Sequence, residues 1–267
     1  MTFSIVARDA DGSQWGVAVA SKFLAVGAAV PAAAHGVGAV ATQAMANLAY
    51  RPAGLALLGQ GRSAAEAVAA LTSADEGREH RQLGIVDAAG ASATFTGDEC
   101  HAWAGGRTGA GWAAQGNILT GPEVIDALVD AYTGTTGALS HRLTQALLAA
   151  DRAGGDRRGR QSAALLVVSE GGGYGGGSDV LVDLRVDDHP DPVPELVRLL
   201  ELHGLFFGRP VPEDVLRLEG ELAAEVAQLL DRLGHPTLES WAGVENFEER
   251  MVPGGIDPLV LAQLRRA

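Results

Sequence analysis

The sequence has little cysteine and few basic residues. Among its 267 residues there is one cysteine, Cys100, so a disulfide within the chain is excluded and a reducing compartment is expected. Lysine and arginine together number 20, against 33 aspartates and glutamates, which gives a formal net charge of −13. Because the chain has no overall excess of positive charge to attract phosphates, we expect no nucleic acid among its partners.

Long hydrophobic runs are missing as well. No unbroken apolar stretch is long enough to cross a membrane, and Arg8 and Asp9 stand where an export signal would be apolar. We therefore expect a cytoplasmic protein that makes no membrane contact. The hydrophobic content of 47% is still sufficient for one large domain with a full-sized core.

The remaining pattern predicts groups of strands that alternate with pairs of helices. Strands are expected at Thr2–Arg8, Gln14–Ser21, 28–44, 82–97, 111–119, 161–170 and 179–188. Helices are expected up to about Gly59, after Ser63, and over 122–134 and 138–155. This order favours antiparallel sheets with helices stacked on their outer faces, which is the α+β class.

Two of the expected helices begin with capping-box spacing. Ser63 is followed three residues later by Glu66, and Thr120 is followed by Glu123 with Pro122 at the start of the helix. In both places the side-chain oxygen is expected to accept a hydrogen bond from the first turn.

The end of the chain has a different composition. From Val211 onward glycine becomes rarer, and helical periodicity is clear over 213–234, 239–251 and 257–267. We expect a main domain over residues 1–209 and a small helical domain over 210–267.

Thr2 has the clearest chemical potential in the sequence. Removal of Met1 gives this threonine a free α-amine beside its hydroxyl, so that one residue holds both a nucleophile and a base. The α-amine, with a reference pKa of about 7.7–8.0, accepts a proton near neutral pH. Removal of an initiator methionine is favoured before a small residue such as threonine.

The resemblance of the chain to a known family rests on six blocks in this order: MTFSIVARD, GVAVASKFLAVGA, GVGAVATQA, AQGNIL, GDRRGRQSAALLVV and DLRVDDHPDPVPELVRLL. They resemble the DUF1028 family, whose core is similar to that of the N-terminal nucleophile (Ntn) hydrolases. The resemblance covers nearly the whole chain. It implies a four-layer αββα sandwich and supplies no substrate. The helical end of the chain resembles a small module called peptidoglycan-binding in some members.

By analogy with the Ntn group, four further residues are expected beside Thr2. Ser21 and Lys22 end the second strand, where Lys22 would lower the pKa of the amine or hold substrate; the alternative is a solvated charge at a strand end. Gly116 and Asn117 are the candidate oxyanion hole, since a glycine N–H or an amide NH2 can stabilise a developing negative oxygen. An Asx turn that ends the strand is the alternative for Asn117.

Four polar residues are candidates for binding substrate. Gln43 and Asn47 are amides among small apolar residues, where each needs a partner; an internal hydrogen bond is the alternative to substrate. Arg157 or Arg158 is expected to contact Asp187 or Asp188 first; a bidentate grip on a substrate carboxylate is the second expectation, and a solvated loop is the alternative to both.

Two segments suggest ligands by composition, but their spacing does not support the suggestion. Residues 187–191 (DDHPD) are consecutive, and consecutive side chains rarely converge on one metal ion. Residues 171–178 (GGGYGGGS) lack the GK[ST] ending of a phosphate loop and are expected to form a flexible loop or a lid. We expect no metal and no cofactor.

The hypothesis from the sequence is therefore an amidohydrolase with Thr2 as nucleophile, acting on the C–N amide bond of a small molecule. The alternative is a non-catalytic binding or structural protein built on an Ntn-like shell. Self-association into a homo-oligomer is expected, through the glycine- and alanine-rich sheets or through the helical domain at the end of the chain.

Overall fold

The computed structural model describes residues 2–267, which form two compact units, the first reaching Leu200 and the second spanning Glu201–Ala267. Met1, whose removal the sequence hypothesis requires, lies outside the described residues. The division falls inside the helix α6, Pro192–Phe207, whereas the sequence placed a domain boundary after residue 209. Each unit is described by itself.

Two antiparallel sheets form the centre of the first unit within residues 2–200. One is a six-stranded sheet in the order β10-β9-β2-β1-β8-β7, and the other is a four-stranded sheet in the order β3-β4-β5-β6. The strands are β1 Thr2–Arg8, β2 Gln14–Ser21, β3 Pro31–Ala34, β4 Gly38–Ala44, β5 Arg81–Asp87, β6 Ser92–Thr96, β7 Gly105–Gly109, β8 Trp112–Asn117, β9 Ser162–Ser169 and β10 Val180–Val186.

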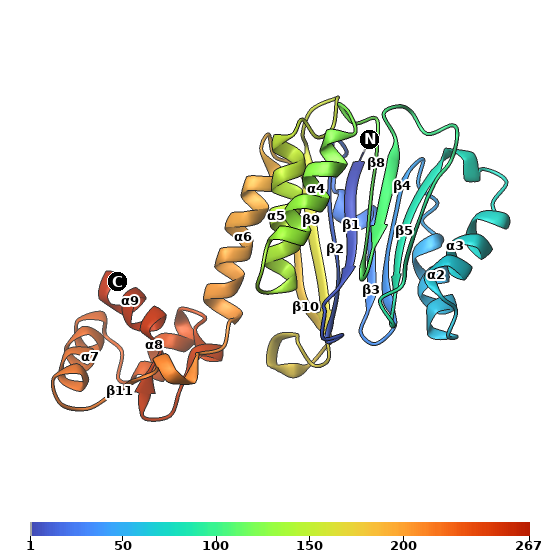
Figure 1. Cartoon of the computed structure of the whole chain (residues 1–267). Coiled ribbons are helices and arrows are strands. Elements are labelled where there is room, and N and C mark those ends of the chain that lie inside the picture. The colour runs from blue at the N-terminus through green and yellow to red at the C-terminus, as the bar shows by residue number, and fades with distance from the viewer. Residues whose placement is uncertain (1) are drawn as a thin grey trace. The chain divides into compact units, whose positions relative to one another are not determined.

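Helices cover the outer face of each sheet. Helices α4 (Glu123–Gly134) and α5 (Leu139–Arg152) pack on the six-stranded sheet, and α2 (Tyr50–Gly59) and α3 (Ala64–Ser73) pack on the four-stranded sheet. The short helix α1 (Val26–Ala29) contacts β2 and β9. Figure 1 shows the resulting layers of helix, sheet, sheet and helix. The α+β prediction is confirmed.

Both faces of the six-stranded sheet are buried, and β1 shows how. Phe3 and Ile5 pack with the helices α4 and α5 on the outer face. Val6 lies between the two sheets, with Trp15 of the same sheet and Ala41 of the four-stranded sheet. Successive side chains of a strand point to opposite faces, so an almost wholly apolar strand is needed where both faces are covered.

Local sequence signals predicted some element boundaries and missed others. The bounds of β1 and β2 are those expected, and Ser63 forms the expected capping box with Glu66. The second predicted box is wrong, because α4 begins at Glu123 without a side-chain cap. The backbone N–H of Thr120 instead donates to the carbonyl of Gly155, which ties this residue to another loop before the helix begins.

The second unit has its own core. Its elements are α7 (Gly220–Leu233), α8 (Leu238–Val244), α9 (Pro258–Arg266) and a short ladder of β11 (Leu216–Arg217) with β12 (Gly255–Ile256). The aromatic rings of Phe206, Trp241 and Phe247 stack there. The buried Arg250 donates to Asp257, the N-cap of α9, and to the carbonyls of Gly204 and Leu205, so one side chain ties three segments together.

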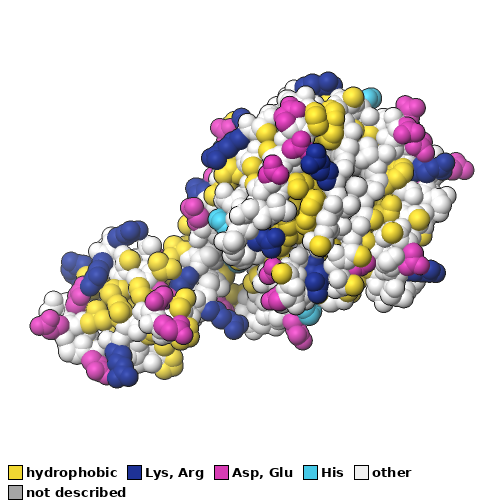
Figure 2. Space-filling view, viewed as in Figure 1, with side chains coloured by type: hydrophobic (Ala, Val, Ile, Leu, Met, Phe, Trp, Pro, Cys, Tyr) yellow, Lys and Arg dark blue, Asp and Glu magenta, His cyan; other side chains and the backbone are white. Residues whose placement is uncertain are grey.

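Charges are spread over the surface. On the visible face, basic and acidic side chains are interspersed (Figure 2). Within residues 2–267, no helix combines the length and the apolar character needed to span a bilayer.

The packing of α5 generates a first prediction. Leu147 is fully buried against the six-stranded sheet, and Leu147→Ala removes buried apolar contacts and leaves a cavity, which costs about 2–5 kcal/mol. Urea unfolding followed by circular dichroism measures the change. His141→Ala, an exposed position on the same helix, is expected to stay within about 0.5 kcal/mol of the parent; equal losses in both variants would contradict the assignment.

Candidate functional site

Several strands end or begin at the same end of the two sheets, and Thr2 lies there. The register pairs Thr2 with Asn117 on β8 and Ser21 with Ser162 on β9, while Phe3 pairs with Ala20 of β2. The start of β1 therefore lies beside the ends of β2 and β8. The turn between β1 and β2 marks the opposite end of the sheet in Figure 1.

Thr2 and Ser21 meet through their side chains. The two hydroxyl oxygens are 3.0 Å apart and either can be the donor; Thr2 is 6% exposed and Ser21 2%. Lys22 follows with an exposed side chain, and its backbone N–H donates to Asp156 Oδ2 at 2.8 Å. The structure thus brings Ser21 into contact with Thr2 and places Lys22 next along the chain.

A buried network of amide side chains continues inward from Thr2 between the sheets. Gln43 Nε2 donates to Gln82 Oε1 at 2.7 Å and to the carbonyl of Thr2 at 3.2 Å. Asn117, opposite Thr2, also donates to Gln82 Oε1, at 3.0 Å. Gln82 in turn donates to the carbonyl of Gly116 at 2.7 Å. One glutamine of the smaller sheet therefore connects Asn117, Gly116 and Gln43.

The network extends one layer further to Ser4 and Gln115. Gln115 Nε2 donates to Ser4 Oγ at 2.6 Å, and Ser4 donates onward to Gln43 Oε1 at 2.6 Å. Gly84 leaves the room that Gln115 needs, because a Cβ at position 84 would lie 2.0 Å from Gln115 Oε1. We call the set Ser4, Gln43, Gln82, Gln115 and Asn117 the amide network.

Sequence reasoning missed Ser4, Gln82 and Gln115. The available signal was a polar residue at an inward position of an otherwise apolar strand, which needs a buried partner. Gln43 was identified from this signal, and the hydrogen bonds of its side chain in the structure are to protein groups. The internal hydrogen bonds weighed as the alternative to substrate binding are therefore present.

Gly116 and Asn117 differ in what they can offer as oxyanion donors. Gly116 lies in β8 between two strands, opposite Phe3 of β1 and Gly105 of β7. Its backbone is part of the ladder, in which the N–H and C=O groups point along the sheet. Asn117 ends the strand, and its amide side chain lies on the inter-sheet face with Gln82. Asn117 is thus the stronger candidate of the two.

Asn47 lies in the loop after β4 and is held by Asp75. Asn47 Nδ2 donates to Asp75 Oδ2 at 3.0 Å, and Tyr50 and Arg81 donate to the same oxygen at 2.9 and 3.1 Å. The hydrogen bond from Asn47, followed by those from Arg81, Tyr50 and the N–H of Gly77, holds the pKa of Asp75 well below its usual range against the opposing effect of burial. The carboxylate thus anchors this loop beside the site.

Asp156 anchors a second loop. Besides the N–H of Lys22, it accepts the backbone N–H of Arg158 at 2.8 Å and forms an ion pair with the Arg158 guanidinium at 3.3 Å. Arg157 has an exposed side chain, and its N–H donates to the carbonyl of Ile118. The partner found for Asp188 is Gln161, at 3.1 Å. The segment 156–161 is therefore attached to the ends of β2 and β8.

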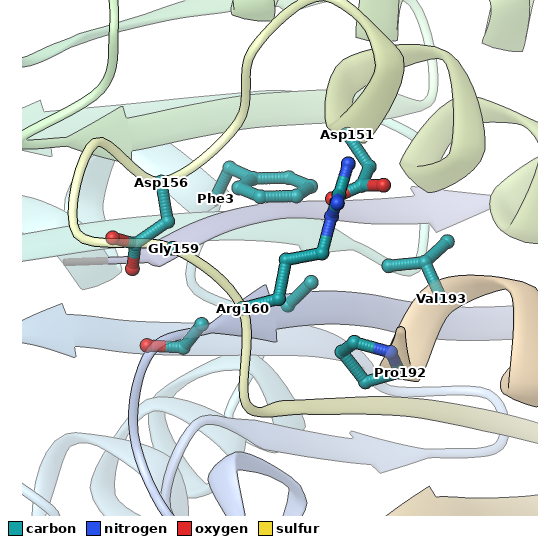
Figure 3. A pocket seen from close by; sticks show the side chains of 9 residues that line it. Phe3, Asp151, Asp156, Gly159, Arg160, Pro192 and Val193 are labelled. Carbon is teal, nitrogen blue, oxygen red and sulfur yellow. The ribbon is translucent and has the colours of Figure 1, made fainter. Parts of the chain in front are cut away.

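A small pocket lies beside Ser21 on the side of Phe3. Arg160 reaches across it toward Asp151, with a 2.7 Å hydrogen bond, as Figure 3 shows. The pocket volume is about 10 Å³, which is the space of one water molecule. It is too small to receive a substrate in this conformation.

Other candidate groups contribute little to this site. Among residues 2–267, no group of three or more His, Cys, Asp or Glu side chains is arranged to hold a metal ion. Burial raises the pKa of the Cys100 thiol, which disfavours the reactive thiolate. The glycine-rich segment joins β9 to β10 next to Gln14, at the end of β2 that lies far from Ser21. The prediction that this segment forms a lid over the site is therefore wrong.

Comparison with known proteins agrees with this architecture. The model of the family described as "Family of unknown function (DUF1028)" matches residues 2–196, and the chain belongs to this family. Residues 206–264 match the family described as "Putative peptidoglycan binding domain". The crystal structure of a DUF1028 protein from Silicibacter pomeroyi is similar, with 32% identity over 83% of this chain and 88% of that chain and a TM-score of 0.69. No curated protein matches the chain.

The amide network predicts a large cost for removing one member. Gln43→Leu deprives Ser4 Oγ, Gln82 Oε1 and the Thr2 carbonyl of a buried partner, and such a loss costs about 1–3 kcal/mol for each group left unsatisfied. We expect urea unfolding to show a loss of about 2–4 kcal/mol. Gln60→Leu, at an exposed position, is the control; a Gln43→Leu variant as stable as the control would contradict the network.

The lowered pKa of Asp75 predicts a pH-dependent contribution to stability. The unfolded chain binds the proton near the reference pKa of about 3.9, above the folded pKa, so the stabilising contribution is complete above that pH and falls as the pH drops further. Urea unfolding of the parent and Asp75→Asn should therefore give a constant difference from pH 7 to 5 that shrinks below about pH 4. If the difference in unfolding free energy between the parent and Asp75→Asn grows as the pH falls, the lowered pKa of Asp75 is contradicted.

Proposed function

We propose that the first unit is an N-terminal-nucleophile amidohydrolase in which Thr2 cleaves a C–N amide bond of a small molecule. The proposal requires cleavage of the peptide bond before Thr2. The observation that carries it is the position of Thr2 at the start of β1, with its hydroxyl buried and 3.0 Å from Ser21 Oγ. Cleavage of the peptide bond before Thr2 gives this residue a free α-amine, which acts as the base beside its own hydroxyl.

The residues around Thr2 fit the steps of acyl transfer. Thr2 Oγ1 attacks the substrate carbonyl, and its proton passes to the α-amine, whose reference pKa is about 7.7–8.0. Ser21 orients the hydroxyl through the bond between the two oxygens. The proton is then delivered to the leaving nitrogen as the C–N bond breaks, which leaves an ester on Thr2 that water hydrolyses.

Asn117 would stabilise the tetrahedral oxyanion. Its side-chain amide lies on the inter-sheet face opposite Thr2 and is fixed by its bond to Gln82. An amide NH2 carries two hydrogens, so the second is offered to the oxyanion while the first holds the group in place. A donor fixed before the reaction needs no reorganisation when the charge develops.

The substrate we propose has an apolar part and an anionic part. Large hydrophobic side chains stand exposed in the loops that follow β2 and β4: Phe23, Leu24, Met45 and Leu48. Lys22 and Arg157 are exposed cations on the segments attached to Ser21 and Asn117, and we assign them, with Arg158, to a carboxylate of the substrate.

The formation of a homo-oligomer, which we expected from the sequence, stays a prediction.

The first experiment determines the intact mass of the purified, untagged protein and its hydrolysis of a panel of acyl anilides. We expect Thr2 at the amino terminus and release of the aniline. Thr2→Ala should reduce kcat by on the order of 10⁶-fold, the scale seen when a nucleophile is removed, whereas Thr2→Ser should retain turnover.

Two controls separate a chemical defect from a folding defect. Thr136→Ala changes an exposed threonine far along the chain and should leave kcat unchanged, and circular dichroism should show Thr2→Ala to be folded. A folded Thr2→Ala variant that hydrolyses the same amides at the parental rate would refute the proposal. Binding of the amides without turnover, by a chain whose Thr2 amine stays blocked, would favour the non-catalytic alternative.

A further inference from the structure

A second pocket lies at the end of β1 opposite to Thr2. It has a volume of about 260 Å³ and is bordered by Arg8, Asp9, Gly90, Tyr132 and Arg142, among others. Six residue steps of about 3.3 Å separate Thr2 from Arg8 along the strand, so the two places are about 20 Å apart. The pocket therefore does not belong to the site proposed above, and it is much larger than the pocket beside Ser21.

Two arginines approach this pocket from different elements. Arg8 ends β1 and its guanidinium lies 5.8 Å from the Trp15 ring centroid, while Arg142 on α5 lies 4.3 Å from the Tyr132 ring centroid. Rings in these positions hold the guanidiniums through cation–π contacts. Arg142 Nη1 is 3.4 Å from Asp9 Oδ1, and Arg8 Nη1 borders Gly90, where an added Cβ would lie 3.4 Å away. Both charged ends thus border the pocket.

Both guanidiniums keep donors that the protein does not satisfy. The Nε atoms of Arg8 and Arg142 are buried and have no hydrogen-bond partner in the described chain. The Arg8 bond to the Asp9 carbonyl and the Arg142 bond to Asp9 Oδ1 are both long, at 3.4 Å. A buried donor without an acceptor lowers the stability of the fold, so both arginines are held at a cost in this structure.

The charges around the pocket favour an anion. Its charged border consists of two guanidiniums and one carboxylate, which leaves one positive charge. The Asp9 carboxylate also accepts a hydrogen bond from the backbone N–H of Ala10 at 2.9 Å. This bond partly offsets the negative charge of the carboxylate. Burial raises the pKa of Tyr132 to about 12, so the ring under Arg142 adds no negative charge at neutral pH.

We propose that this pocket binds a small oxyanion, a phosphate or a carboxylate group, between the guanidiniums of Arg8 and Arg142. The planar guanidinium matches an oxyanion through two parallel N–H donors. Gly90 and Gly111 on the neighbouring turns keep the approach open, since neither carries a side chain.

Isothermal titration of the full chain with inorganic phosphate, and separately with acetate, at constant ionic strength tests this site. We expect saturable binding of one equivalent. Arg142→Gln should weaken it about tenfold or more, the loss of one charge-assisted hydrogen bond. Asp9→Asn should tighten it, because this change removes the competing carboxylate and retains both guanidiniums. Binding of phosphate alone identifies a phosphate site, binding of acetate alone identifies a carboxylate site, and binding of both identifies a site that accepts either oxyanion.

The matched control is Arg62→Gln, which removes an exposed arginine of the same unit and should leave the affinity unchanged. Asp9→Asn keeps the test decisive if Arg142→Gln does not fold. Absence of saturable binding by both anions overturns the proposal. Equal weakening by Arg62→Gln, which would signify a diffuse charge effect, or an affinity that neither pocket variant changes, also overturns it.

Discussion

The hydrogen bonds of the amide network are the constraint on which the geometry around Thr2 depends. Elsewhere the layer between the sheets is apolar, with Val17 and Val19 packed against Ala39. Near Thr2 it contains amides from both sheets, and a buried amide is tolerated only when it is hydrogen-bonded. Because Gln43 and Gln82 must meet donors and acceptors of the opposite sheet, the network fixes the register and separation of the sheets more narrowly than apolar packing does.

The sequence predicted those elements whose signals are local. Residues with a high propensity for strands and a turn-forming loop between them located β1 and β2, and Ser63 with Glu66 located the start of α3. Strand β7, Gly105–Gly109, has no comparable signal, because its residues are glycine or exposed and it is held by pairing with β8. The capping box expected at Thr120 failed although its local signal was present, because the N–H of Thr120 donates to the carbonyl of Gly155 and not to the side chain of Glu123.

The residues of the candidate site were also predicted only in part. Thr2, Ser21 and Asn117 were named from the sequence, and the structure brings them to one end of the sheets. The partners that fix them were not named, because a polar residue in an apolar strand shows that a partner is needed but not which element supplies it. Asn47 was named as a candidate for binding substrate, but its side chain is held by Asp75, 28 residues away, and the sequence did not indicate this partner.

The support of Thr2 also explains how a residue at the start of a strand can be held firmly. Its described contacts come from Ser21 on β2, Gln43 on β4 and Asn117 on β8. All three lie later in the chain, so cleavage of the bond before Thr2 leaves them in place. The new amine would occupy the position of the former amide nitrogen, within reach of the side chain of the same residue. The residue that we propose as the nucleophile is therefore placed by strands and a buried network that follow it in the chain, and it needs no preceding segment to orient it.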